Sequence, residues 1–318
     1  MIETRKKWTI NEIEEIHGQP LLELVYQSAT VFRKYHDPRE IQVSALLSIK
    51  TGGCAEDCKY CSQSSFYETD TKAEPMMEIG QILEQAKKSR DQGASRFCLS
   101  TAWRQIPDTQ MKNILEIVNS VSKLGMEVCA TMGMLTRTQA QKLREAGLHT
   151  YNHNLDTGEK FYDKIVSTRT YQERLDTLNF AQEAGLNICS GGILGMGESK
   201  HDRMDMLRNL ANLKKQPESV PINVLVPIEG TAMQKDPDFS FWDLLRTICT
   251  ARILMPESNV RLSAGRNSLS AVEQSFCFFA GANSIFSGDK LLTTDNVLPD
   301  QDEELLSLLG LYKKYHSH

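Results

Sequence analysis

Short apolar runs rich in β-branched residues alternate with amphipathic helical stretches along this chain of 318 residues, and this alternation constrains the fold most. We expect eight strands, at residues 43–49, 96–100, 127–131, 150–154, 187–191, 222–226, 260–264 and 282–286. Helical stretches are expected between them at residues 78–92, 109–124, 137–146, 171–184, 201–213 and 241–254. Strand–helix units in this order predict an α/β fold of the (β/α)8 TIM-type barrel class. An open, doubly wound sheet is the structural alternative.

The two ends of the chain lie outside this alternation. Residues 1–40 are predicted to form an N-terminal helical extension, with helices at 11–16 and 21–35. Residues 41–298 would form the barrel, and residues 299–318 a C-terminal tail that is a capping helix or partly disordered. No stretch rich in Pro, Gly or Ser divides the chain, so one large barrel is favoured over two domains.

Composition and charge exclude several classes of protein. The net charge of −5 gives no support to nucleic-acid binding, which usually shows a basic field. No apolar run approaches the length that crosses a bilayer. The basic N-terminus has no apolar stretch behind it, so a secretory signal is not expected. A reducing cytoplasm is therefore the expected location.

Three cysteines, Cys54, Cys58 and Cys61, form a C-x3-C-x2-C run just after the first predicted strand. Three soft ligands from one short loop suit a 4Fe–4S cluster with one iron left without a protein ligand. A structural zinc site is the main alternative, but it needs four ligands and no second cysteine pair follows. A disulfide set is disfavoured by the odd number and by the absence of a secretory signal.

Three further cysteines, Cys98, Cys129 and Cys189, each fall in the middle of a predicted strand. Equivalent places on barrel strands point to the same interior, although cysteine also packs an interior well. Arg261 lies in the seventh predicted strand, and an inward-facing guanidinium would need anionic partners such as thiolates or sulfide. An outward arginine paired with a helix carboxylate is the alternative. Core packing is the expected role of the two remaining cysteines, Cys249 and Cys277.

The cysteine loop, residues 52–63, resembles the signature of radical S-adenosylmethionine enzymes, and in detail it is similar to the biotin synthase family. The resemblance covers most of the chain, because further segments at 151–157, 168–171, 260–266 and 283–286 also look like that family. The chain departs from the family pattern at Ala55, where proline is frequent, and at Ser100 and Thr101, where a pair of small residues is frequent.

The resemblance implies a radical sulfurtransferase that inserts sulfur into dethiobiotin to form biotin. Cys54, Cys58 and Cys61 would hold the 4Fe–4S cluster, whose open iron binds S-adenosylmethionine. A 2Fe–2S cluster, the sulfur donor, would lie deeper in the barrel. Its ligands would be Cys98, Cys129, Cys189 and Arg261. The family also implies an electron-donor protein of flavodoxin or ferredoxin type, and a homodimer.

The same resemblance carries further site residues. S-adenosylmethionine contacts are expected from Thr101, Asn154, Asp156, Arg174, Ile193 and Val226. Dethiobiotin contacts are expected from Asn154 and Asn223, because an amide offers the ureido ring both a donor and an acceptor. Without the family, Asn154 and Asp156 fit a turn after a strand and Arg174 fits a solvated helix charge.

Two other functions remain open from the sequence. A radical enzyme acting on another small molecule would hold no metal at Cys98, Cys129 and Cys189. A non-catalytic iron–sulfur electron carrier would not cleave S-adenosylmethionine, and the size of the predicted barrel argues against it.

Overall fold

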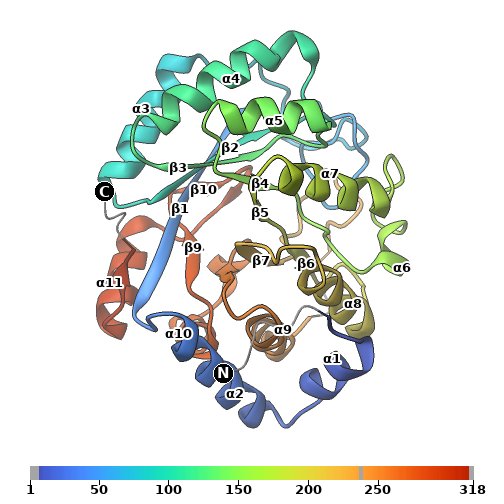
Figure 1. Cartoon of the computed structure of the whole chain (residues 1–318), viewed down its shortest axis with the longest axis vertical. Helices are drawn as coiled ribbons and strands as arrows, with labels where there is room; N and C mark the ends of the chain where they lie inside the picture. The colour runs from blue at the N-terminus through green and yellow to red at the C-terminus, as the bar shows by residue number, and fades with distance from the viewer. Residues whose placement is uncertain (1–6, 236–238, 315–318) are drawn as a thin grey trace.

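The computed structural model describes residues 7–235 and 239–314, which form a barrel of parallel strands surrounded by helices (Figure 1). The barrel strands are β1 (Glu40–Lys50), β2 (Arg96–Thr101), β3 (Glu127–Thr131), β4 (Thr150–Asn152), β5 (Asn187–Cys189), β7 (Ser219–Val224), β8 (Asn259–Leu262) and β9 (Ser284–Phe286). Each strand pairs with the next, and β9 pairs with β1, with Val43 opposite Ile285. The sheet is therefore closed, which confirms the barrel and excludes the open alternative.

The helices that follow the strands cover the outside of the barrel. They are α3 (Ile79–Asp91), α4 (Asp108–Ser122), α5 (Arg137–Glu145), α7 (Tyr171–Glu183), α8 (Lys200–Ala211), α9 (Phe241–Leu254) and α10 (Ala271–Ala280). Several begin at a capping box, for example at Thr136 and Thr170, whose side chains accept a hydrogen bond from the backbone N–H three residues on. This arrangement satisfies backbone donors that the first helical turn leaves free.

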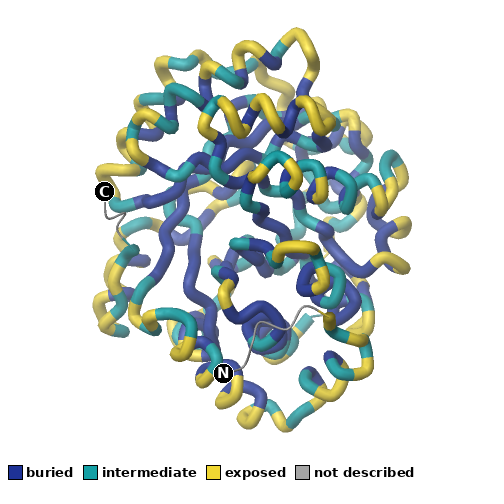
Figure 2. The backbone as a smooth tube through the Cα atoms, in the orientation of Figure 1, coloured by how far each residue is buried: buried dark blue, intermediate teal, exposed yellow. Residues whose placement is uncertain are grey.

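Two N-terminal helices, α1 (Ile10–His17) and α2 (Leu21–Tyr35), pack over α8 and α9. The apolar stripe of α2 includes Leu24, Val25 and Phe32, which are all buried. Because α2 covers it, α9 is dark along most of its length in Figure 2, where buried residues are blue. The predicted helical extension is thus a second layer over one side of the barrel.

The C-terminal segment also packs on the barrel. After a short hairpin of β10 (Lys290–Leu291) and β11 (Thr294–Asp295), the chain forms α11 (Pro299–Leu309) and β12 (Tyr312–Lys313). β12 adds to β1 in parallel, with Tyr312 opposite Glu40. The tail is therefore a helix followed by a paired strand over the residues that the structure describes.

Smaller elements interrupt the regular alternation. A short helix, α6 (Glu159–Tyr162), follows β4, and a 3-10 turn, η1 (Arg266–Ser268), follows β8. The predicted strand at 187–191 ends at Cys189, and a separate strand, β6 (Gly192–Leu194), pairs with β7. Within residues 7–235 and 239–314, no helix has both the length and the apolar character needed to span a membrane.

Candidate active site at the C-terminal mouth of the barrel

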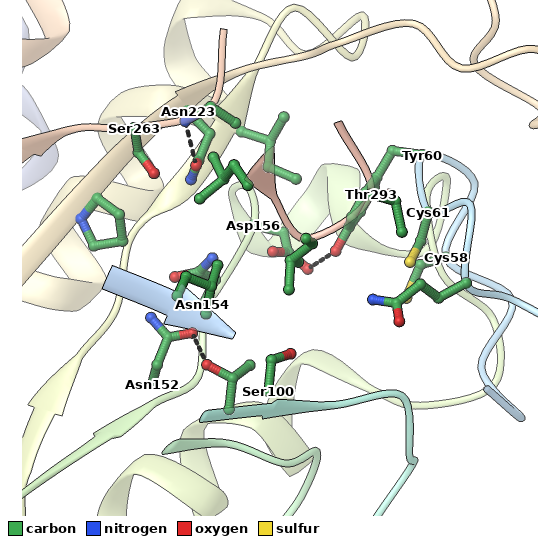
Figure 3. A pocket seen from close by; sticks show the side chains of 18 of the residues that line it. Cys58, Tyr60, Cys61, Ser100, Asn152, Asn154, Asp156, Asn223, Ser263 and Thr293 are labelled. Atoms are coloured by element: carbon green, nitrogen blue, oxygen red, sulfur yellow. Dashed lines mark hydrogen bonds between the residues drawn. The ribbon is translucent and has the colours of Figure 1, made fainter. Parts of the chain in front are cut away.

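A cavity of about 310 Å³ opens at the C-terminal ends of the barrel strands. Both predicted sets of cysteines contribute to its lining, since Cys54, Cys58, Cys61, Cys98 and Cys129 all border it, and so does Arg261. Figure 3 shows two facing walls with Asp156 between them: one carries Cys58, Tyr60 and Cys61, and the other carries Asn152, Asn154 and Asn223. A pocket of this kind, at this face, is where barrel enzymes place their reacting groups.

The cysteine loop follows β1 and is held at its ends by backbone hydrogen bonds. The N–H of Cys54 donates to the carbonyl of Gln63 at 2.8 Å, and the N–H of Ser65 donates to the carbonyl of Cys54 at 2.8 Å. The loop begins at Gly52, whose φ of +67° and contact with Lys72 leave no room for a Cβ atom. The turn therefore needs glycine at the point where the chain leaves the strand.

The three loop thiols are protonated at neutral pH in the absence of metal. Burial raises the pKa of each thiol, and it raises the pKa of Cys61, which also lies near Cys58, to about 12. Because a metal binds the thiolate, binding displaces these protons and becomes stronger as the pH rises.

The spacing of the thiols does not fit a single metal ion. In a tetrahedral zinc site the sulfur atoms lie about 4 Å apart, from Zn–S bonds of about 2.3 Å. Among the described residues, the one group of three metal-ligating side chains with all ligand atoms within 4.8 Å of one another is Glu127, His149 and Glu218. Neither set of three cysteines is that compact in the part of the chain that the structure describes.

The second set of cysteines lies inside the barrel, on β2, β3 and β5. Cys98 and Cys129 are paired across β2 and β3, and Cys189 lies opposite Asn152 across β4 and β5. All three are almost fully buried, with exposed fractions of 2%, 1% and 0%. A hydrogen bond between Cys98 and Cys129 lowers the pKa of Cys98 and raises that of Cys129 well above its usual value. Of the two thiols, Cys98 is therefore the one that loses its proton more readily.

Arg261 points into the barrel, and its side chain is 1% exposed. It donates to the hydroxyls of Ser284 at 2.9 Å and Ser44 at 3.0 Å, and its Nη1 lies 3.8 Å from the sulfur of Cys189. No carboxylate within the described ranges forms an ion pair with it. An arginine buried beside thiols and neutral groups calls for an anion at this place.

Asp156 and Arg174 form a buried ion pair at the edge of the cavity. The Asp156 carboxylate also accepts from the hydroxyl of Tyr60 at 2.8 Å, as Figure 3 shows. Arg174 donates in addition to the hydroxyl of Tyr162 at 2.6 Å and to the carbonyl of Asn154. The guanidinium is thus not a solvated helix charge, and it keeps two of its five N–H donors for a ligand.

The remaining predicted contacts also line the cavity. Asn154 accepts a hydrogen bond from the N–H of Gly191, and Asn223 donates to the carbonyl of Gly192 at 2.9 Å. The hydroxyl oxygen of Thr101 is buried without a hydrogen-bond partner and is available to a ligand. The apolar part of the lining includes Ile193 and Val226.

Two cavity residues were not predicted from the sequence. Asn152 donates to the sulfur of Cys189 at 3.1 Å, and Arg169 donates to the sulfur of Cys58 at 3.3 Å. Asn152, Asn154 and Asp156 alternate along one segment, so the strand period of two is the signal that could have found Asn152. Arg169 lies in a loop after α6, where no periodicity exists to indicate its direction.

The Glu127, His149 and Glu218 group lies at the opposite, N-terminal end of the barrel. Both carboxylates form ion pairs with Arg96, which donates to Glu127 at 2.6 Å and to Glu218 at 2.9 Å. The group is therefore explained as a partly exposed ion-pair network around the buried Arg96.

Comparisons with known families agree with this geometry. Residues 48–210 match the Radical SAM superfamily, and residues 221–312 match the Biotin and Thiamin Synthesis associated domain. The first match begins within β1 and includes the cysteine loop. The second spans β7 to β12 and includes Arg261.

Curated relatives match over almost the whole chain. The chain is 54% identical over 316 residues to a biotin synthase from Nostoc punctiforme, covering 98% of this chain and 94% of the relative. It is 52% identical over 312 residues to a biotin synthase from Cytophaga hutchinsonii, covering 98% and 93%. A biotin synthase from Legionella pneumophila is 51% identical over 311 residues, covering 98% and 99%.

Solved structures share the fold at low identity. A methylornithine synthase has a TM-score of 0.81 at 18% identity, covering 97% of this chain and 95% of that one. The FeFe-hydrogenase maturase HydG from Carboxydothermus hydrogenoformans has a TM-score of 0.83 at 18% identity, covering 98% and 77%. At this identity the likeness supports the barrel architecture alone.

Proposed function

The chain belongs to the biotin synthase family of radical S-adenosylmethionine enzymes and forms biotin from dethiobiotin, and we propose which residues carry this sulfur insertion. Membership of the family brings a 4Fe–4S cluster, S-adenosylmethionine and a reductant. The ligand set of the cluster, the second cluster and the contacts to substrate are the parts proposed here.

Cys54, Cys58 and Cys61 would hold the 4Fe–4S cluster at the outer wall of the cavity. When bound there, the cluster and S-adenosylmethionine supply radical chemistry, which unactivated C–H bonds require because they offer no acidic proton. Tyr60, between two of the ligands, is fixed by its hydrogen bond to Asp156 and closes that wall. The loop therefore presents its thiols to the cavity.

Cys98, Cys129, Cys189 and Arg261 would hold a 2Fe–2S cluster, the sulfur donor, at the inner end of the same cavity. The observation that carries this proposal is Arg261: it is buried beside Cys189, and its other partners among the described residues are hydroxyls and an amide rather than a carboxylate. Thiolates and cluster sulfides would supply the missing negative charge. Asn152 would orient Cys189 through its hydrogen bond to the sulfur.

The space between the two thiol sets is where dethiobiotin and S-adenosylmethionine would meet. Asn154 and Asn223 would bind the ureido ring, since each amide keeps donor or acceptor capacity beyond its bond to the backbone. Asp156 would accept from the ribose hydroxyls, and Arg174 would pair with the carboxylate of S-adenosylmethionine. Thr101, Ile193 and Val226 would complete the cofactor contacts. Holding both molecules in one orientation is the main task of these residues.

Three further features are proposed from the family. The reductant would be a flavodoxin or ferredoxin type protein, and the enzyme would be a homodimer. A reducing cytoplasm would be its location, which fits eight cysteines that are all free thiols.

A substitution of Cys189 tests the assignment of the sulfur donor. We expect Cys189→Ala to form no biotin while still cleaving S-adenosylmethionine, because the outer thiols are intact. Anaerobic incubation with dethiobiotin, S-adenosylmethionine and a reductant, followed by product analysis, measures both. Cys249→Ala, which removes a buried thiol of α9 far from the cavity lining, is the matched control and should keep both activities. Full sulfur insertion by Cys189→Ala would refute the assignment.

A further inference from the structure

The loop that joins α6 to α7 forms direct hydrogen bonds with the cysteine loop. Asp57, which stands between two of the ligands, accepts hydrogen bonds from the N–H groups of Ser167 at 2.9 Å and Thr168 at 3.1 Å. The Thr168 hydroxyl bridges the two loop carboxylates, because it contacts both Glu56 and Asp57. We call residues 167–169 the latch segment. It ties the cysteine loop to the start of α7, which is part of the barrel wall.

Glu56, the other carboxylate of the loop, is 2% exposed. It forms an ion pair at 3.0 Å with Arg104, which also donates to the carbonyl of Thr168. A buried carboxylate is stable only when it is paired in this way. Glu56 and Asp57 thus serve as the attachment points of the loop, although neither one is a soft metal ligand.

Arg169 completes the latch segment and is the one residue of it that contacts a ligand sulfur. Its Nη2 donates to Cys58 at 3.3 Å, and its Nε lies 3.8 Å from Glu56. The side chain is 8% exposed, so solvent screens its charge only weakly. Its Nε is buried without a hydrogen-bond partner.

A cation beside a ligand sulfur has two physical effects. It fixes the direction of that sulfur, as hydrogen bonds around metal ligands generally do. It also stabilises the more negative, reduced state of a cluster, because hydrogen bonds and positive charge at the sulfurs raise the reduction potential. An easier reduction of the outer cluster favours the electron transfer on which the reaction depends.

We propose that Arg169 is a positioning residue for the outer cluster: from the latch segment it holds Cys58 in place and raises the reduction potential of the cluster bound there. This inference rests on the proposed function, in which Cys54, Cys58 and Cys61 are the ligands. Arg169 acts through Cys58, and no contact with substrate is required.

The test compares three variants after anaerobic reconstitution with iron and sulfide. Reduction potentials are measured by titration with a graded reductant, following the electron paramagnetic resonance signal of the reduced 4Fe–4S cluster. Arg169→Gln should shift the potential to more negative values, and Arg169→Lys, which keeps the charge, should recover much of that shift. Arg104→Gln is the control: it removes a cation that contacts the same Glu56 but no ligand sulfur. The reduction potential of the cluster in this variant should therefore stay close to that of the parent.

The outcomes separate the inference from the function on which it rests. Equal potentials for the parent and Arg169→Gln would overturn the inference. If Arg169→Gln binds no cluster, a circular dichroism spectrum equal to that of the parent supports a positioning role, and a loss of folded structure overturns it. A parent protein that forms no 4Fe–4S signal would instead contradict the proposed ligand set.

Discussion

The carboxylate of Asp156 accepts hydrogen bonds from Tyr60 in the cysteine loop and from Arg174 in α7. Asp156 itself has a left-handed backbone φ of +67°. Such a conformation is rare outside glycine, although aspartate tolerates it better than most residues. The hydrogen bonds from Arg174 and Tyr60 hold Asp156 in this conformation, and both residues line the cavity. At the scale of single residues, hydrogen bonds among the side chains of the site fix their positions independently of any ligand.

We expect Asp156→Ala to lower the free energy of unfolding by about 3–5 kcal/mol, because Arg174 is then a buried, unpaired cation. Asp156→Asn keeps the acceptor oxygen and tolerates the positive φ, so it should cost less. Urea unfolding of the cluster-free proteins at pH 7.5 measures both. Equal stability of parent and Asp156→Ala would mean that the ion pair contributes nothing net.

A second residue-scale prediction concerns His17, at the end of α1. Its Nδ1 bonds to the Thr250 hydroxyl at 3.0 Å, and its Nε2 is buried without a partner. Burial, together with the nearby charge of Arg246, lowers the pKa of His17 to about 4. As the pH falls from about 6.5 to 4, the unfolded chain takes up a proton that the folded protein does not, so stability falls with pH.

His17→Asn keeps a donor toward Thr250 and removes the titration. The parent should therefore lose about 3 kcal/mol more stability than this variant between pH 7 and pH 4. Urea unfolding of both proteins across that range gives the difference. A pH dependence that is identical in the two proteins would show that His17 does not contribute to it.

At the scale of elements, close backbone contacts decide where the strands end. Gly191 follows β5, and a Cβ atom on it would lie 1.9 Å from the carbonyl oxygen of Pro221 in β7. The sequence suggested a continuous strand over 187–191, because apolar pattern does not reveal a contact of this kind. The contact ends β5 at Cys189 and allows Gly191 to bond with the Asn154 side chain.

Gly191→Ala should therefore destabilise the protein by about 1–3 kcal/mol and weaken substrate binding, since β5 must move away from β7. Gly80→Ala is the matched control: nothing lies within 4 Å of its Cβ position in α3, and alanine favours the helix. We expect that variant to gain up to about 1 kcal/mol. Thermal unfolding and the KM for dethiobiotin are measured for both variants. A Gly191→Ala variant with the stability and KM of the parent would contradict the role of the close contact.

The accuracy of the sequence-based prediction follows the strength of the local pattern. The helix at 241–254 and the strand at 127–131 have the predicted bounds, and in the strand a buried apolar run lies between the polar residues Glu127 and Thr131. The hairpin at 290–295 was missed because its strands are two residues long. The inward direction of Arg261 could be predicted only from a resemblance, whereas the link from Arg169 to Cys58 depends on a loop conformation that no local pattern encodes.

At the scale of the whole molecule, the three loop cysteines line the same cavity as Cys98 and Cys129, and Cys189 contacts the lining residue Asn152. Cys54 and Cys61 are partly exposed on a loop, whereas Cys98, Cys129 and Cys189 lie on paired strands inside the closed barrel. Loops open with little cost in free energy, whereas exposure of barrel strands requires much of the fold to open. The two proposed cluster sites should therefore exchange metal on different time scales.

We expect a chelator to remove iron from the outer site first. During anaerobic incubation of the reconstituted enzyme with EDTA, Mössbauer spectra should show the 4Fe–4S component decline several-fold faster than the component of the proposed 2Fe–2S cluster. Sub-denaturing urea should accelerate loss from the inner site more than from the outer one, because only the inner site needs the barrel to open. Parallel loss of both components, with equal dependence on urea, would mean that the barrel does not protect the inner site.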